Sequence, residues 1–96
     1  MRFLNSKLKI ENTILQNIAK KYGTPAYCYS YKQLKENIND FKKNFKSISP
    51  LICFAIKSNT NLNLIKEIKK FGLGADVVSM GELMLALKAG ISPKKI

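Results

Sequence analysis

A lysine follows a run of six apolar residues in the stretch LICFAIKSN, residues 51–59. Such a run predicts a strand that is buried on both faces, so Lys57 marks the point at which that strand ends. Two interpretations of this position are open. Either the ammonium group simply extends into water where the chain reaches the surface, or the fold presents an amine at the floor of a pocket.

An acidic residue, Asp76, lies in the next predicted strand, GADVV at residues 74–78. In parallel α/β folds the reacting groups lie at the carboxyl ends of strands, because the loops there converge on a pocket. Desolvation and a nearby positive charge both lower the pKa of a lysine, and a neutral lysine amine condenses with an aldehyde. Lys57 is therefore a candidate nucleophile. Asp76 is either its neighbour in a pocket or a solvated strand end.

The segments that precede the strand at residues 51–56 also show local patterns. Residues 1–21 show a weak helical pattern with Asn12 as a possible cap, and residues 26–29, AYCY, form a short β-prone run. Apolar residues then recur at steps of three and four over residues 31–45, directly after the capping-box sequence SYKQ. This spacing predicts an amphipathic helix.

Two further helices are predicted around the second strand. The first begins at a capping Asn59 or Asn61 and ends at Gly72, a residue type that adopts the left-handed conformation found there. The second begins at a capping box formed by Ser79 and Glu82. The side chains expected to face inward on these helices are Leu62, Ile65, Ile68, Leu83, Ala86 and Leu87.

The resulting order is helix, strand, helix, strand, helix, which implies parallel strands joined by crossovers. Two such strands cannot close a sheet on themselves, and a (β/α)8 barrel needs about 250 residues. The fold class predicted for these 96 residues is therefore α/β, as the first βα units of a TIM-type barrel.

Composition favours a globular protein, since 46% of the residues are apolar. No apolar run approaches the length of a membrane span, and no secretory pattern opens the sequence, so we expect a cytoplasmic protein without membrane contact. The formal net charge is +11, but the lysines are spread over the whole length and sixteen of the seventeen basic residues are lysine. This distribution argues against nucleic-acid binding, where arginine is the better phosphate ligand.

The two cysteines, Cys28 and Cys53, lie inside apolar runs and are expected to be buried structural thiols. The sequence contains no CxxC pair and no histidine, so it predicts no metal site and no Ser-His or Cys-His nucleophile.

Three stretches in this order resemble the N-terminal part of the diaminopimelate decarboxylase family: YGTPAYCY, FAIKSN and GADVVSMGEL. That family comprises pyridoxal-phosphate enzymes built on an alanine-racemase-like barrel and is related to the eukaryotic-type ornithine decarboxylases. The resemblance covers residues 22–96. The departures are mild, since this chain has Phe54, Ile56 and Ser58 where the common pattern is Tyr, Val and Ala.

The resemblance implies that Lys57 binds pyridoxal 5′-phosphate covalently and is the catalytic residue. It implies that Ala55 lies against the cofactor, on the same side of the strand as Lys57, although a small core residue is the alternative. Asp76 would line the same pocket as an electrostatic partner of the lysine or of the imine it forms. Glu82 matches another acidic pocket position, although its capping box alone would account for it.

The resemblance also implies that much of the site lies further along the family's chain. The phosphate loop, the partner of the pyridine nitrogen, the substrate-binding arginines and a β-rich second domain are all expected beyond residue 96. Within the present chain, residues 1–24 are expected to be an N-terminal leader and residues 25–96 to be part of the barrel domain. The full-length enzyme is expected to be a homodimer, whereas these residues alone should be inactive.

The predicted reaction is the pyridoxal-phosphate-dependent conversion of meso-diaminopimelate, a small-molecule amino acid, to L-lysine. Three alternatives stay open. The first is another decarboxylase of the same fold that acts on ornithine, arginine or carboxynorspermidine, and the second is an amino-acid racemase on the same barrel. The third is a non-catalytic basic module, either a gene remnant or a nucleic-acid binder.

Overall fold

The computed structural model describes residues 1–4 and 6–96, and it places the side chains of residue 1 and residues 6–96. The chain divides into two compact units, residues 1–43 and residues 44–96, each of which is described by itself. The division predicted from the sequence, with a leader over 1–24, stays a prediction.

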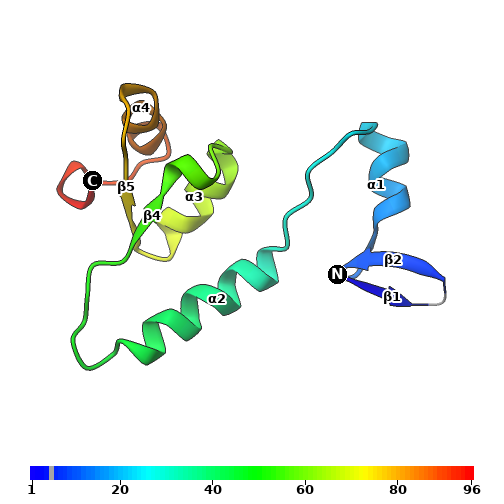
Figure 1. Cartoon of the computed structure of the whole chain (residues 1–96), viewed down its shortest axis with the longest axis horizontal. Coiled ribbons are helices and arrows are strands. Elements are labelled where there is room, and N and C mark those ends of the chain that lie inside the picture. The colour runs from blue at the N-terminus through cyan, green and yellow to red at the C-terminus, as the bar shows by residue number, and fades with distance from the viewer. Residues whose placement is uncertain (5) are drawn as a thin grey trace. The chain divides into compact units, whose positions relative to one another are not determined.

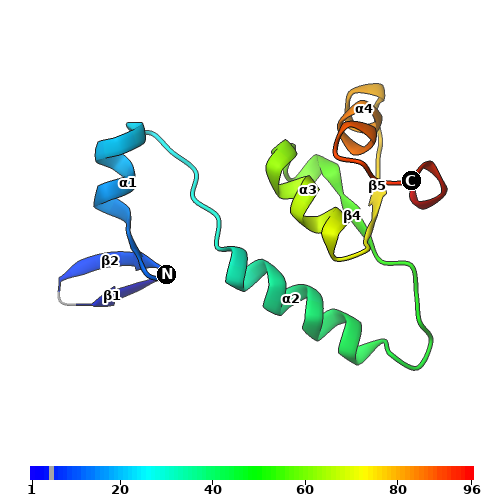
Figure 2. The ribbon, with the colours of Figure 1, turned by 180° about the vertical axis from the view of Figure 1, so that it is seen from behind.

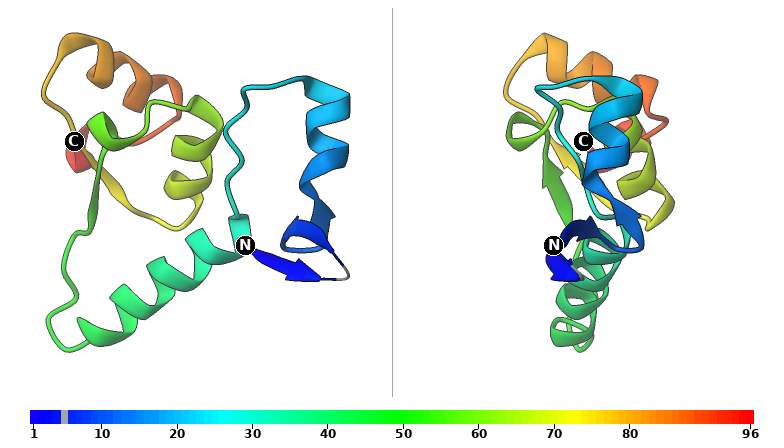
Figure 3. Two further views of the ribbon diagram at one scale, coloured as in Figure 1. Left: turned by 45° about the vertical axis from the view of Figure 1, so that its right-hand side comes forward. Right: turned by 90° about the vertical axis from the view of Figure 1, so that its right-hand side faces the viewer.

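The N-terminal unit combines a small antiparallel sheet with helices (Figure 3). Its elements are β1 (Arg2–Leu4), β2 (Lys7–Ile10), β3 (Thr13–Ile14), α1 (Leu15–Tyr22) and α2 (Tyr31–Asn44), the last of which ends one residue beyond the unit. Strand β2 lies between β1 and β3 and pairs antiparallel with both. Glu11 and Asn12 form the two-residue turn between β2 and β3, and Glu11 adopts a left-handed φ of 53° there.

The helical pattern predicted for residues 1–21 is therefore wrong over the strands and holds only from Leu15 onward. Asn12 lies in the turn and does not cap the helix, because the N-cap residue is Ile14 and no side chain bonds the helix start. The short alternation of apolar and polar residues in β2 fits a strand paired on both sides better than a helix.

The amphipathic helix predicted after SYKQ is confirmed as α2. Its Ser30 hydroxyl accepts the backbone N–H of Gln33 at 3.0 Å, which confirms the cap. The β-prone run at 26–29 is wrong as a strand, since these residues pair with no strand in the described part of the chain. On the apolar face of α2, Ile38 is buried and Phe41 is exposed, and Phe45, one residue beyond the helix, is exposed as well.

The C-terminal unit contains two parallel strands and two helices, seen from opposite sides in Figures 1 and 2. Its elements are β4 (Cys53–Ala55), the 3-10 helix η1 (Ile56–Ser58), α3 (Leu62–Lys70), β5 (Gly74–Asp76), α4 (Met80–Lys88) and the 3-10 helix η2 (Pro93–Lys95). Strands β4 and β5 pair in parallel, which confirms the predicted connection through a helix.

The predicted helix ends in this unit are also confirmed. The side chain of Asn61 accepts the N–H groups of Asn63 and Leu64 at 3.0 and 3.3 Å, so Asn61 is the cap of α3. Gly72 has a φ of 80°, the left-handed conformation expected after this helix.

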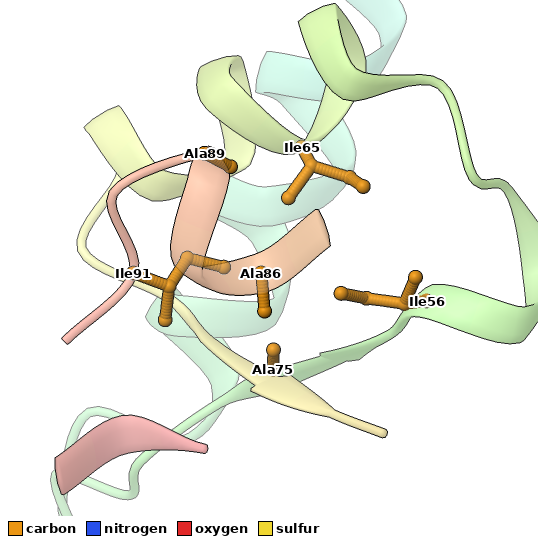
Figure 4. Packing of buried hydrophobic residues seen from close by; sticks show 6 residues of the cluster. All are labelled: Ile56, Ile65, Ala75, Ala86, Ala89 and Ile91. Atoms are coloured by element: carbon orange, nitrogen blue, oxygen red, sulfur yellow. The ribbon is translucent and has the colours of Figure 1, made fainter. Parts of the chain in front are cut away.

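The core of the C-terminal unit is a cluster of aliphatic side chains between the strands and the two helices (Figure 4). Its members come from η1, α3, β5, α4 and the residues just after α4: Ile56, Ile65, Ala75, Ala86, Ala89 and Ile91. Ile56, Ile65 and Ala86 are completely inaccessible to solvent. The cluster joins the end of β4 to α3 and α4, so apolar burial fixes the segment that precedes Lys57.

Three expectations about burial in this unit are wrong. The run LICFAI is a strand only at Cys53–Ala55, and Leu51 is 56% exposed. Cys53 is an exposed free thiol and Cys28, in the other unit, is half-buried, so neither is the buried thiol expected. Leu87, expected to face inward, is 41% exposed. The residues around β4 are less buried than expected because β5 is its one neighbour among the described strands, so the other edge of β4 has no paired strand.

Candidate functional site

The candidate site lies where β4 and β5 end. Ala55 is the last residue of β4 and pairs in register with Asp76, the last residue of β5. Neighbouring strands lie about 5 Å apart, so the backbone at Asp76 adjoins the segment that carries Lys57. The structure thus brings together two predicted site residues, Ala55 and Asp76, that are 21 positions apart in the sequence.

Lys57 is the middle residue of η1, which follows β4 without a break. Its side chain is exposed, and its ammonium group makes no hydrogen bond or ion pair within the described residues 44–96 of its own unit. The residue before it, Ile56, is fully buried in the core cluster, as Figure 4 shows. A rigid anchor therefore precedes a side chain whose amine is accessible, an arrangement that suits covalent attachment of an aldehyde.

Ala55 is half-buried at the strand end. The expectation that it shares a side with Lys57 relied on strand alternation, in which residues two apart point the same way. That alternation stops at Ala55, because the 3-10 helix η1 begins at Ile56. The proposed contact of Ala55 with a cofactor stays a prediction and no longer has the strand geometry as its support.

Glu82 has a defined structural role at the start of α4. Its backbone N–H donates to the Ser79 hydroxyl at 3.2 Å, and its carboxylate accepts the N–H of Val78 at 2.9 Å. The predicted capping box is therefore present, with the returning bond made to Val78, the residue before the cap. Helix α4 also contacts η1, so this cap holds the loop after Asp76 beside the segment that carries Lys57.

Three polar contacts were missed from the sequence. The Ser58 hydroxyl donates to the carbonyl oxygen of Ala55 at 2.7 Å, a local bond that the three-residue spacing could have indicated. The Val78 contact of Glu82 is also local. The third contact joins Glu11 to Ser30, which are 19 residues apart, and no local pattern announces it.

Glu11, in the turn between β2 and β3, binds the start of α2 with its side chain. Its carboxylate accepts the backbone N–H of Lys32 and the hydroxyl of Ser30, both at 2.8 Å. These bonds, the one from the Lys32 backbone first, lower the pKa of Glu11 below its ordinary value of 4.5. A carboxylate here also faces the positive end of the helix dipole.

Two open clefts of about 350 and 410 Å³ belong to this N-terminal unit, and neither includes Lys57 or Asp76. The described residues contain no cluster of histidine, cysteine, aspartate or glutamate able to hold a metal ion. Within the same residues, no helix combines the length and the apolar character needed to cross a bilayer.

Residues 31–96 match the family described as “Pyridoxal-dependent decarboxylase, pyridoxal binding domain”. Over its full length the chain is 43% identical to a diaminopimelate decarboxylase of Aquifex aeolicus, of which it covers 22%. A diaminopimelate decarboxylase of Helicobacter pylori strain J99 is 42% identical over 84% of the chain and is covered to 20%. The chain thus spans about a fifth of the length of these curated relatives.

Solved structures agree with these matches. A crystal structure of a protein from Aquifex aeolicus superposes with a TM-score of 0.91 at 42% identity, covering 98% of this chain and 23% of that one. A diaminopimelate decarboxylase structure titled as from “m. jannaschi” has the same TM-score and coverages at 33% identity. These similarities confirm the predicted fold class, the first βα units of a TIM-type barrel.

Proposed function

The chain belongs to the pyridoxal-dependent decarboxylases, and we propose that it is the N-terminal part of an enzyme that converts meso-diaminopimelate to L-lysine. The named relatives support the substrate, since diaminopimelate decarboxylases of several bacteria are 34–44% identical to this chain. The observation that carries the proposal is the position of Lys57, an exposed lysine immediately after a barrel strand.

In this proposal Lys57 binds pyridoxal 5′-phosphate, and the residues present fit that role. The amine is not engaged by any described group of its own unit, and the backbone before it is held by the buried Ile56. When bound, pyridoxal phosphate accepts the electron pair that decarboxylation leaves on the substrate carbon. Lys57 provides the amine to which the cofactor is attached, and this amine bonds to the cofactor again when the product amine leaves.

Asp76 is proposed to act electrostatically at the same strand edge. Asp76 is the last residue of β5 and pairs in register with Ala55, so its backbone adjoins the segment that carries Lys57. A negative charge at this edge attracts the positively charged Lys57 side chain when the two groups come close. Glu82 supports this arrangement, because its carboxylate accepts the Val78 N–H and so holds the loop that follows Asp76.

The remaining features of the proposal rest on the resemblance and on the family. They are a homodimeric full-length enzyme in the cytoplasm, with the phosphate loop and the substrate-binding residues in the longer part of the chain that the relatives possess. The net charge of +11 is proposed to reflect solvated lysines and no nucleic-acid partner.

Borohydride reduction of the full-length protein, followed by peptide mapping, tests the attachment. We expect the reduced cofactor on Lys57, and we expect Lys57→Ala to abolish both the yellow absorbance of the bound cofactor and the release of carbon dioxide from meso-diaminopimelate. Lys66→Ala, which alters an exposed lysine of α3, is the matched control and should retain both.

A cofactor label on Lys20, Lys21 or any other lysine would overturn the assignment. Substrate choice is tested separately by comparing carbon dioxide release from meso-diaminopimelate, ornithine and arginine. Faster release from ornithine or arginine would leave the role of Lys57 intact and reject the proposed substrate.

A further inference from the structure

The turn that carries Lys57 is closed by two hydrogen bonds that span it. The Ser58 hydroxyl donates to the carbonyl oxygen of Ala55 at 2.7 Å, and the backbone N–H of Asn59 donates to the carbonyl oxygen of Ile56 at 3.0 Å. Both bonds connect a residue after Lys57 to a residue before it. They therefore restrict the backbone from which the Lys57 side chain extends.

The same turn is anchored on both sides. Ile56 is fully buried among the core side chains, and Figure 4 shows it pointing toward Ala86 from the end of β4. On the other side, the Asn59 side chain accepts the N–H of Asn61 at 2.9 Å, and Asn61 in turn caps α3. Of the two hydrogen bonds that span Lys57, the one from Ser58 is made by a side chain and the one from Asn59 by the backbone.

We propose that Ser58 is a positioning residue whose hydroxyl fixes the turn and so holds the Lys57 amine at the carboxyl edge of β4 and β5. This inference rests on the proposed function, in which that amine must meet the aldehyde of the cofactor. The family pattern has alanine at this position, so the hydroxyl adds to a turn that the Asn59 bond already closes. The effect of losing it is therefore partial.

A comparison of serine variants in the full-length protein tests the proposal. Ser58→Ala removes the hydroxyl and keeps the Cβ, whereas Ser58→Thr retains a hydroxyl that can reach Ala55. Ser49→Ala is the matched control, because the Ser49 hydroxyl also donates to a carbonyl three residues earlier, that of Lys46 at 3.4 Å, and this bond does not span Lys57.

The measured quantity is the rate at which Lys57 is modified. After removal of bound cofactor with hydroxylamine, each variant is mixed with pyridoxal 5′-phosphate and quenched with borohydride at intervals over a range of pH. The amine nitrogen bonds to the aldehyde carbon with loss of water, and hydride from borohydride then reduces the C=N bond. We expect Ser58→Ala to slow labelling of Lys57 about three- to tenfold, the size of one exposed hydrogen bond. Ser58→Thr and Ser49→Ala should stay within about twofold of the unaltered protein on the same scale.

Amide hydrogen exchange separates positioning from a general loss of stability. In Ser58→Ala we expect faster exchange at Asn59, whose N–H closes the turn, and unchanged exchange at Ile65 in the core of α3. Faster exchange at both amides would mean that the hydroxyl stabilises the whole unit, and the proposal would be wrong.

The outcomes also separate this inference from the proposed function. If the unaltered protein is labelled at Lys57 and Ser58→Ala is labelled equally fast, only the positioning role is rejected. If the unaltered protein is not labelled at Lys57 at all, the proposed function and this inference are both rejected.

Discussion

In residues 44–96, two short strands and two helices bury eight apolar side chains, six of which form one cluster. In residues 1–43, Ile38 is the one buried side chain among those that the structure places. The clearest link between distant residues in that unit is polar, from Glu11 to the start of α2. Buried apolar area therefore stabilises the unit that carries Lys57, while exposed hydrogen bonds contribute more of the order in the other.

The physical reason is the spacing of contacts along the chain. A βα repeat brings a strand, a helix and the next strand together within about 30 residues, so its inward side chains find partners nearby. The small sheet of the N-terminal unit has few residues per strand, and none of the side chains placed in β2 and β3 is fully buried. The difference teaches that the first site residues of this fold are positioned by a core that forms locally.

The largest expected effect tests whether the apolar cluster stabilises the C-terminal unit. Ile65 is fully buried in the cluster, so Ile65→Ala should lower the free energy of unfolding by about 2–5 kcal/mol. Ile48→Ala, at a position that is 68% exposed, should change it by less than about 0.5 kcal/mol. Urea unfolding of the full-length protein measures both values, and equal losses would show that the cluster is not the source of stability.

A smaller effect is expected at Gly74, where β5 passes close to the backbone of η2. A Cβ at Gly74 would collide with the carbonyl oxygen of Lys95 and would lie 2.8 Å from the Cys53 sulfur. Gly74→Ala should therefore cost about 1–3 kcal/mol of unfolding free energy, because backbone must shift. Thermal unfolding of the full-length protein provides the measurement.

Gly81→Ala is the control for this substitution. Its Cβ would meet only the Ser79 hydroxyl at 3.9 Å, and the position lies inside α4. Alanine should stabilise the helix there by about 0.5–1 kcal/mol. A similar loss in both variants would indicate that the close approach at Gly74 has no special cost.

The smallest expected effect tests the hydrogen bonds that Glu11 makes in the N-terminal unit. Because its hydrogen bonds lower the pKa of Glu11, the stabilising contribution of this carboxylate is fully present above the ordinary value of 4.5 and is lost as the pH falls through the lowered value. The Lys32 amide, which donates to Glu11, should therefore exchange faster with solvent in acid than its neighbours do, after correction for intrinsic exchange rates.

Glu11→Gln should give faster exchange of the Lys32 amide near neutral pH and should remove its additional acid dependence. Glu36→Gln is the control, since Glu36 meets the Lys32 ammonium at 3.9 Å on an exposed surface and does not touch the amide. An unchanged amide in Glu11→Gln would show that this carboxylate does not hold the start of α2.

Local sequence patterns identified the elements of the C-terminal unit well. The caps at Asn61 and Ser79 and the left-handed Gly72 depend on residues within three positions of one another, so spacing alone revealed them. The spacing of apolar residues likewise revealed α2. Lys57 could be singled out for the same reason, because a cation directly after a long apolar run is a local signal.

Tertiary structure decided what depends on partners far along the chain. It paired β1, β2 and β3 into a sheet, since strands that short are stable only when paired, and it left residues 26–29 without a strand partner in the described part of the chain. It left Cys53 exposed, because the burial of a strand is a property of its neighbours and not of its own side chains. It also placed Asp76 in register with the end of β4, a juxtaposition that only the hydrogen bonds of a parallel pair can establish.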